Sequence, residues 1–202
     1  IINITKSVAC GNRIQSVLEI PSSMKNGSDT NLARADEVAF DHVGLTYAQA
    51  GTESLTDIDF SAKAGQTIGI IGGTGSGKSS LVNLISRFYN ITSGTVRVDG
   101  HSLTDVSINS LRAQMGVMTQ DNFLFSGTIR DNIAYGKLDA TEEEIIAAAK
   151  AVHAHDFIIE LPDGYDTEIS ERGARLSNGQ RQLLAFARTM VSDPRILILD
   201  EA

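Results

Sequence analysis

Residues 72–79 read GGTGSGKS, and this short stretch decides the fold of the chain. It fits the pattern G-x-x-x-x-G-K-[ST], whose glycines let the backbone curl so that successive N–H groups point at phosphate oxygens. A side chain at Gly75 or Gly77 would obstruct that approach or require an unfavourable φ. In this pattern Lys78 is a cation for the β- and γ-phosphates, and the Ser79 hydroxyl is a ligand for Mg²⁺. The stretch therefore predicts a loop that binds the phosphates of a nucleotide.

The residues on either side supply the context that such a loop requires. Residues 67–71 (TIGII) form an apolar run without polar alternation, which predicts a buried parallel strand. Apolar residues at helical spacing predict a helix over 78–89, and the N-terminus of a helix favours a bound anion. A glycine-rich turn with an accidental Lys-Ser is the alternative, and the agreement of pattern with context disfavours it.

A second motif lies near the end of the sequence. Residues 195–200 (RILILD) predict a short apolar strand that ends in Asp200 and is followed by Glu201. Carboxylates at the end of a buried strand are costly unless they are paired or bound to a metal. We therefore expect Asp200 to hold Mg²⁺, directly or through water, and Glu201 to be the general base that polarises an attacking water. A solvated turn at this point is the alternative.

Composition narrows the class of protein. The chain has 202 residues, of which 42% are hydrophobic and 21% charged, as expected for one or two globular domains. The net charge of −8 disfavours a nucleic-acid-binding face. The single cysteine, Cys10, excludes a disulfide framework. No apolar run approaches the roughly 18 residues that cross a bilayer.

The N-terminal region differs in composition from the rest. Residues 1–20 have apolar positions at helical spacing, and Pro21 ends the predicted helix. Residues 21–35 are rich in Ser, Asn, Gly and Asp and predict a linker, so we expect the globular domain to begin near Asp36. The first and last residues of the sequence resemble neither a start nor a natural end, which indicates a piece of a longer protein.

The rest of the sequence predicts strands at both ends and helices between them. Strand signals cover residues 38–47, 58–61, 95–98 and 101–103, the last two joined by an Asp-Gly turn. Helices are expected over 141–152, where Thr141 and Glu144 form a capping box, over 155–160 and over 178–191. This order predicts an α/β core with an inserted helical subdomain at about 107–190, the core returning at 195–202.

The stretch LSNGQRQLLAFAR, residues 176–188, separates the classes of phosphate-loop protein. No N-K-x-D motif occurs, which argues against a GTPase, and arginines at 172, 175 and 181 leave a small-molecule kinase open. Ser177, Asn178 and Gly179 stand at a helix start, where a hydroxyl and free N–H groups can bind an anion. An ordinary helix cap without a ligand is the alternative.

LSNGQ followed by QLLAFAR, ahead of a strand ending in Asp-Glu, resembles the signature motif of ATP-binding cassette (ABC) proteins. The resemblance covers nearly all of residues 36–202. Tyr47 matches the aromatic residue that stacks on adenine, and residues 72–80 match the Walker A loop. Gln120 matches the glutamine of the Q-loop, and residues 196–201 match the Walker B strand with its catalytic glutamate.

Further segments look like those of ABC exporters. Residues 120–136 (QDNFLFSGTIRDNIAYG) resemble the segment that follows the Q-loop, and residues 167–173 (TEISERG) resemble the X-loop. Residues 1–35 look like the end of a membrane-domain helix and its linker. The resemblance implies an integral membrane transporter whose ATPase domain, residues 36–202, lies at the cytoplasmic face of a membrane, such as a bacterial plasma membrane.

The resemblance also implies a fold and a set of site residues. The fold is that of a P-loop NTPase of ABC type, a mixed sheet with an antiparallel β subdomain and a helical subdomain, here without the C-terminal part of the core. Lys78, Gln120 and Glu201 would be catalytic, and Ser79, Gln120 and Asp200 would bind Mg²⁺. ATP would contact Tyr47, Gly72, Gly73, Thr74, Gly75, Ser76, Gly77, Lys78, Ser79, Ser80 and Gln120 of one subunit, and Ser177, Asn178, Gly179 and Gln180 of the other.

In the family, two such domains sandwich two ATP molecules head to tail, and a membrane domain of the same or a partner chain completes the transporter. A homodimer and a heterodimer both stay open, and Asn178 stands where the family usually has Gly. We expect ATPase activity in the full-length protein and weak or no activity in the isolated chain. A soluble ABC ATPase of DNA repair or translation, and a non-catalytic nucleotide-binding module, are the alternatives. Nothing in these residues identifies the cargo.

Overall fold

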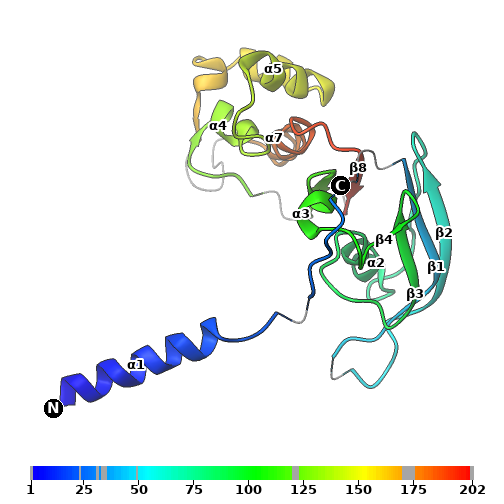
Figure 1. Cartoon of the computed structure of the whole chain (residues 1–202). Helices are drawn as coiled ribbons and strands as arrows, with labels where there is room; N and C mark the ends of the chain where they lie inside the picture. Colours follow the sequence, from blue (N-terminus) through cyan, green and yellow to red (C-terminus); the bar gives the residue numbers. More distant parts are fainter. Residues whose placement is uncertain are drawn as a thin grey trace.

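The computed structural model describes residues 2–22, 24–30, 32, 36–48, 50–119, 123–169 and 176–200 of the chain. Figure 1 shows an N-terminal helix, a sheet with one helix against it, and a group of helices on the other side of a short pair of parallel strands. The buried side chains form two separate hydrophobic clusters, one behind the sheet and one among the helices.

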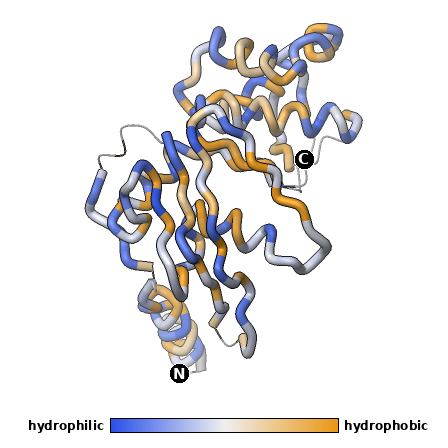
Figure 2. Tube along the Cα trace, turned by 90° about the vertical axis from the view of Figure 1, so that its right-hand side faces the viewer, coloured by the Kyte–Doolittle hydropathy of each residue, from blue (hydrophilic) through white to orange (hydrophobic). Residues whose placement is uncertain are grey.

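Helix α1 (Ile2–Leu18) confirms the helix predicted before Pro21. It extends away from the rest of the chain in Figure 1, and hydrophobic and hydrophilic residues alternate around it in Figure 2. The side chains of Ile4, Val8, Ile14, Val17 and Leu18 are exposed, Leu18 by 79%. No helix among the described residues is both long and apolar enough to cross a membrane.

The antiparallel sheet has the strand order β2-β1-β3-β4. Its strands are β1 (Glu37–Leu45), β2 (Leu55–Lys63), β3 (Ser93–Val98) and β4 (His101–Ser102). Phe40 of β1 is paired with Phe60 of β2, and their rings stack at 4.7 Å. The predicted Asp99-Gly100 turn is confirmed, because both residues have positive φ, as a tight hairpin turn of this kind requires.

Helix α2 (Lys78–Ile85) packs against this sheet with Leu81, Leu84 and Ile85, which are buried in the first hydrophobic cluster. The sequence predicts a helix to residue 89, and the structure ends it at Ile85. Arg87 has φ +50°, a left-handed conformation that an α-helix of L-residues does not continue through.

The predicted buried strand at residues 67–71 is wrong for this structure. These residues form no strand, and the side chains of Ile71 and Ile68 are 95% and 45% exposed. An apolar run becomes a buried strand only where neighbouring strands pair with it. The parallel strands among the described residues, β5 (Met115–Met118) and β8 (Ile196–Leu199), pair with each other. The strand expected over 195–200 is confirmed as β8.

The helical part, residues 123–191, confirms the helices expected there. It contains α4 (Ile129–Ala134), α5 (Glu142–Ala151), α6 (His155–Ile159), the 3₁₀-helix η1 (Gly164–Asp166) and α7 (Asn178–Met190), with a small pair of strands β6 (Gly127–Thr128) and β7 (Glu168–Ile169). Helix α3 (Ile108–Arg112) precedes it. Capping boxes begin α4, α5 and α7, each with the reciprocal bonds of side chain and backbone that satisfy free N–H groups.

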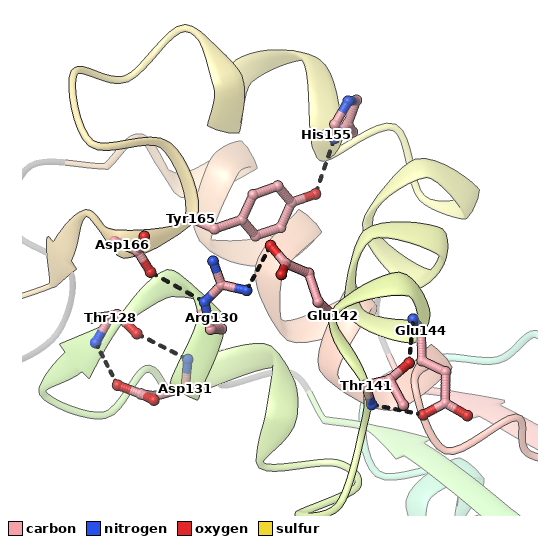
Figure 3. Close-up of polar contacts among 9 residues, drawn as sticks. All are labelled: Thr128, Arg130, Asp131, Thr141, Glu142, Glu144, His155, Tyr165 and Asp166. Atoms are coloured by element: carbon pink, nitrogen blue, oxygen red, sulfur yellow. Dashed lines mark hydrogen bonds and ion pairs between the residues drawn. The ribbon is translucent and has the colours of Figure 1, made fainter.

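A network of polar contacts joins several elements of the helical part (Figure 3). Arg130 of α4 bridges Glu142 of α5 and Asp166 of η1, with N···O distances of 3.1 Å to each. These two carboxylates, Asp166 first, raise the pKa of the Arg130 guanidinium. Its guanidinium also lies 6.0 Å from the ring centre of Tyr165, whose hydroxyl is 3.0 Å from Nδ1 of His155. Four short elements are thus tied together around one cation.

Candidate nucleotide-binding site

The glycine-rich loop ends directly at the first turn of α2. Gly77 is the N-cap of this helix with φ +91°, and Gly75 has φ +80°, conformations that favour glycine. No side chain caps the helix at Gly77, in contrast to the capped α4, α5 and α7. The first N–H groups of α2 are therefore left for another acceptor, and an anion is the acceptor that a helix N-terminus favours.

The start of β2 fixes the position of this loop. A Cβ atom added at Gly77 would lie 2.8 Å from Cδ2 of Leu55 and 3.0 Å from the carbonyl oxygen of Ser54. Only glycine permits this approach at the observed φ. The sequence predicts glycine at position 77 because a side chain would obstruct the phosphates. The structure adds that a side chain there would also collide with Leu55 and Ser54.

Lys78 is turned back over the loop that precedes it. Its Nζ donates hydrogen bonds to the carbonyl oxygens of Gly72 (2.7 Å) and Gly73 (2.9 Å). Residues 71–76 are exposed to solvent, so an anion can reach this ammonium group. Phosphate oxygens carry a full negative charge and would accept stronger bonds from Lys78 than the neutral carbonyls do.

Two tyrosines border the same helix. The hydroxyl of Tyr47 donates to Oγ of Ser80 at 2.8 Å, and the Tyr47 ring meets the ring of Tyr89 edge to face at 4.8 Å. The structure thus brings Tyr47 beside the end of the predicted 72–80 loop. Tyr89 was missed by the sequence reasoning, which used it only as the end of a helix.

Lys78 and Asp200 line one cavity of about 670 Å³. The pairing of β8 with β5 places Asp200 at its edge, where the Asp200 N–H donates to the carbonyl of Met118 at 3.0 Å. Asp200 is half-buried and the Ser79 side chain is exposed. Carboxylate and hydroxyl oxygens are the hard ligands that Mg²⁺ prefers, so these donors fit that ion. The lining of the cavity also includes the apolar residues Ile68, Ile70 and Leu199.

The predicted signature residues stand at the start of α7. Oγ of Ser177 accepts from the N–H of Gln180 at 3.2 Å, and the Ser177 N–H donates to Oε1 of Gln180 at 2.9 Å. Ser177 and Gln180 thus form a capping box at the start of α7. Asn178, which accepts a bond from the Arg181 guanidinium, and Gly179 are exposed. Figure 1 places α7 among the helices and α2 beside the sheet, so this chain does not bring the signature to its own loop.

Some predicted residues lie outside the described part of the chain. These are Gln120, Glu201 and the arginines at 172 and 175. The described site therefore consists of the 72–80 loop, Tyr47 and Asp200.

A family model and known relatives of this chain agree with each other. The model of the ABC transporter family matches residues 55–202. A multidrug export ATP-binding/permease protein of Staphylococcus aureus (strain NCTC 8325) is 50% identical over 165 residues, which are 82% of this chain and 28% of that protein. The corresponding protein of the bovine strain RF122 is 50% identical over 161 residues, with 80% and 28% covered. The chain thus spans less than a third of the length of these relatives.

A solved structure agrees with the sequence relatives. The structure of a bacterial Atm1-family ABC exporter with ATP bound superposes with a TM-score of 0.88 at 37% sequence identity. The match covers 98% of this chain and 35% of the exporter chain.

Proposed function

Because the chain belongs to the ABC transporter family, we propose that it is the ATP-binding and ATP-hydrolysing domain of an exporter. One observation carries this proposal: the Lys78 ammonium lies over the glycine loop, at the uncapped start of α2, on the same cavity as Asp200. That arrangement combines a cation, free N–H groups and a carboxylate, which together suit a nucleoside triphosphate with its metal ion.

Each residue has a defined task in this proposal. Lys78 exchanges its bonds to the loop carbonyls for bonds to phosphate oxygens, while the first N–H groups of α2 bind the same anion. Ser79 and Asp200 hold Mg²⁺, with Gln120 as a further ligand. When bound, this ion neutralises charge on the transferred phosphoryl group. Glu201 orients the attacking water as general base, and Tyr47 stacks on the adenine.

The position of the signature supports a partner domain. Asn178 and Gly179 are exposed at the start of α7, apart from the phosphate loop of the same chain. We therefore propose that Ser177, Asn178, Gly179 and Gln180 contact the ATP of a second ABC domain, arranged head to tail in a homodimer or a heterodimer. Two such domains would place the uncapped α2 of one opposite the α7 start of the other.

A membrane domain is the second proposed partner. The relatives from Staphylococcus aureus are named as combined ATP-binding and permease proteins, and this chain matches only 28% of their length. We propose that residues 1–35 connect the ATPase domain to such a permease, at the cytoplasmic face of a bacterial plasma membrane. Neither the family match nor the relatives' names favour a soluble ABC ATPase.

The proposal is tested by separating ATP binding from turnover in the longer protein. Glu201→Gln keeps the size of the side chain and removes its basicity, so ATP affinity should stay as in the wild type while phosphate release falls by at least about a hundredfold, the scale of general-base catalysis. Calorimetric titration with Mg·ATP and a phosphate-release assay measure the two quantities. Continued turnover would remove Glu201 from its role, and wild-type protein that does not bind ATP would overturn the proposed function.

A further inference from the structure

The chain between α1 and the sheet is bonded to the domain rather than free of it. Residues 24–30, called the strap below, run beside the segment that precedes α3, and Asp29 forms a parallel β-bridge with Val106. The Asp29 N–H donates to the carbonyl of Asp105 at 3.0 Å, and the Ser107 N–H donates to the carbonyl of Asp29 at 2.8 Å. The side chains of Asp29 and His101 form a further pair at 2.9 Å.

Two residues of the strap fix its register. A Cβ atom added at Gly27 would lie 2.2 Å from the carbonyl oxygen of Asp105 and 2.4 Å from that of Val106, so only glycine allows the strap to lie this close. Oδ1 of Asn26 accepts from the N–H of Ile108 at 2.8 Å. This bond satisfies the first N–H group of α3, which has no side-chain cap of its own.

Arg87 connects the strap to the phosphate-loop helix. It follows the last turn of α2, its side chain is only 4% exposed, and Nη2 donates to the carbonyl of Lys25 at 2.7 Å. Nη1 donates to the carbonyl of Val106 at 3.2 Å. Burial lowers the pKa of the Arg87 guanidinium, and the nearby carboxylate of Asp105 raises it. Because an arginine stays charged in proteins, this buried cation needs acceptors such as the two carbonyl oxygens.

Helix α3 completes a closed ring of contacts. Arg112 of α3 donates to the carbonyl oxygens of Ser86 (3.1 Å) and Arg87 (3.1 Å), the free acceptors at the C-terminal end of α2. The strap therefore holds the start of α3 through Asn26, α3 holds the end of α2 through Arg112, and α2 holds the strap through Arg87. Each of the three is therefore bonded to the other two.

We propose that Arg87 is a positioning residue that couples nucleotide binding at Lys78 and Ser79 to the docking of the strap. Helix α2, from Lys78 to Ile85, is about 12 Å long, and its backbone hydrogen bonds connect the phosphate loop to the residues directly before Arg87. An anion that holds the first turn of α2 in place therefore also restricts the end of this helix, where Arg87 bonds the strap. This inference rests on the proposed function, because it assumes that ATP binds the 72–80 loop.

Hydrogen exchange of the whole 202-residue chain, with and without Mg·ATP, tests the coupling. The reporters are the amides of Asp29, Ser107 and Ile108, which donate within the strap contacts. Saturating Mg·ATP should slow their exchange by at least about fivefold, the low end of measured couplings between sites. By reciprocity, loss of strap docking should weaken ATP affinity by the same factor.

Four variants separate coupling from simple stability. Arg87→Met removes the donors, and Gly27→Ala lifts the strap while Arg87 stays intact. Both should abolish the ATP-dependent slowing at the strap, although the 72–80 loop is still protected by ATP. Lys25→Ala is the matched control, because Lys25 contributes its main-chain carbonyl, and it should behave as the wild type. Arg87→Lys keeps the charge without the fork and should restore part of the effect.

The outcomes are distinct. Protection of the 72–80 loop by ATP without any change at the strap amides would overturn the coupling and leave the proposed function intact. The same holds if Arg87→Met and Gly27→Ala both transmit ATP binding as well as the wild type. Absence of protection at the loop itself would overturn the proposed function, and the coupling with it.

Discussion

Isoleucines of the helical part, residues 123–191, and of the phosphate-loop segment, residues 67–80, lie in opposite environments. Ile133 in α4 is fully buried, whereas Ile71, directly before the glycine loop, is 95% exposed. Helices α4, α5 and α7 each begin with a capping box, whereas α2 begins at a glycine without a side-chain cap. Side chains of the helical part thus cap three of its helices, although α6 has no side-chain cap, whereas the start of α2 presents free N–H groups.

The difference lies in where the partners of each region come from. The helical part draws its partners from its own residues, some close in sequence, such as Thr141 with Glu144, and some further apart, such as Arg130 with Asp166. The phosphate loop needs partners from outside its own segment: strand neighbours for residues 67–71 and an anion for Lys78. A region whose polar groups find partners within the region does not need a ligand to satisfy them. A region with unpaired polar groups can bind a ligand that satisfies them.

The largest effect is expected from a cavity in the helical part. Leu184 of α7 is fully buried, and Leu184→Ala should reduce the free energy of unfolding by about 2–5 kcal/mol. Because the two hydrophobic clusters are separate, faster hydrogen exchange should appear in α4, α5 and α7 and not in β1–β3. Leu138→Ala, at a site 85% exposed, is the matched control and should be neutral. Equal acceleration in the sheet would show that the two parts are not independent.

The next effect is expected on ligand affinity rather than on folding. Lys78→Ala removes a charged donor to the phosphates, and such bonds contribute about 1.5–3 kcal/mol, so Mg·ATP affinity should fall about 10- to 150-fold. The unfolding midpoint should change little, because Lys78 bonds only exposed loop carbonyls. Lys63→Ala removes an exposed cation on the same cavity and should leave affinity unchanged. Unchanged affinity in Lys78→Ala would contradict the phosphate-loop assignment.

Residues with local partners were the ones that sequence alone could place. The capping box at Thr141, the Asp99-Gly100 turn and the glycines at 75 and 77 each act within a few positions, so their patterns predicted the observed geometry. The sequence also predicts a helix start at the signature, and Ser177 is the N-cap of α7.

Long-range contacts were not predictable in the same way. The composition of residues 21–35 indicated a linker, but the strap is held by main-chain atoms of Asp29 and by the absence of a side chain at Gly27, and neither leaves a compositional signal. Burial of residues 67–71 depends on strand neighbours that their own sequence does not specify. The pairing of Tyr47 with Tyr89 likewise depends on the end of α2, which the sequence placed too late.

A smaller effect is expected from a single cap in the helical part. Thr141→Ala removes the acceptor of the Glu144 N–H, which is bonded at 3.3 Å, and should reduce stability by about 0.5–2 kcal/mol. Thr141→Ser keeps the hydroxyl and should recover most of the loss. Urea unfolding followed by circular dichroism measures both variants. A loss in Thr141→Ala close to that in Leu184→Ala would mean that local caps, rather than the buried core, dominate this part.

The smallest effect is expected at residues 67–71, which the sequence predicts to be a buried strand and which form no strand in the structure. Ile71→Ser in the 202-residue chain replaces a side chain that is 95% exposed, so the free energy of unfolding should change by less than about 0.5 kcal/mol. Ile198→Ser, at a buried position of β8 in the sheet-side cluster, is the matched comparison and should cost several kcal/mol, because it combines a cavity with a buried hydroxyl. If Ile71→Ser reduced stability as much as Ile198→Ser, residues 67–71 would be a buried strand. The phosphate-loop segment would then not differ from the helical part in the burial of its apolar residues.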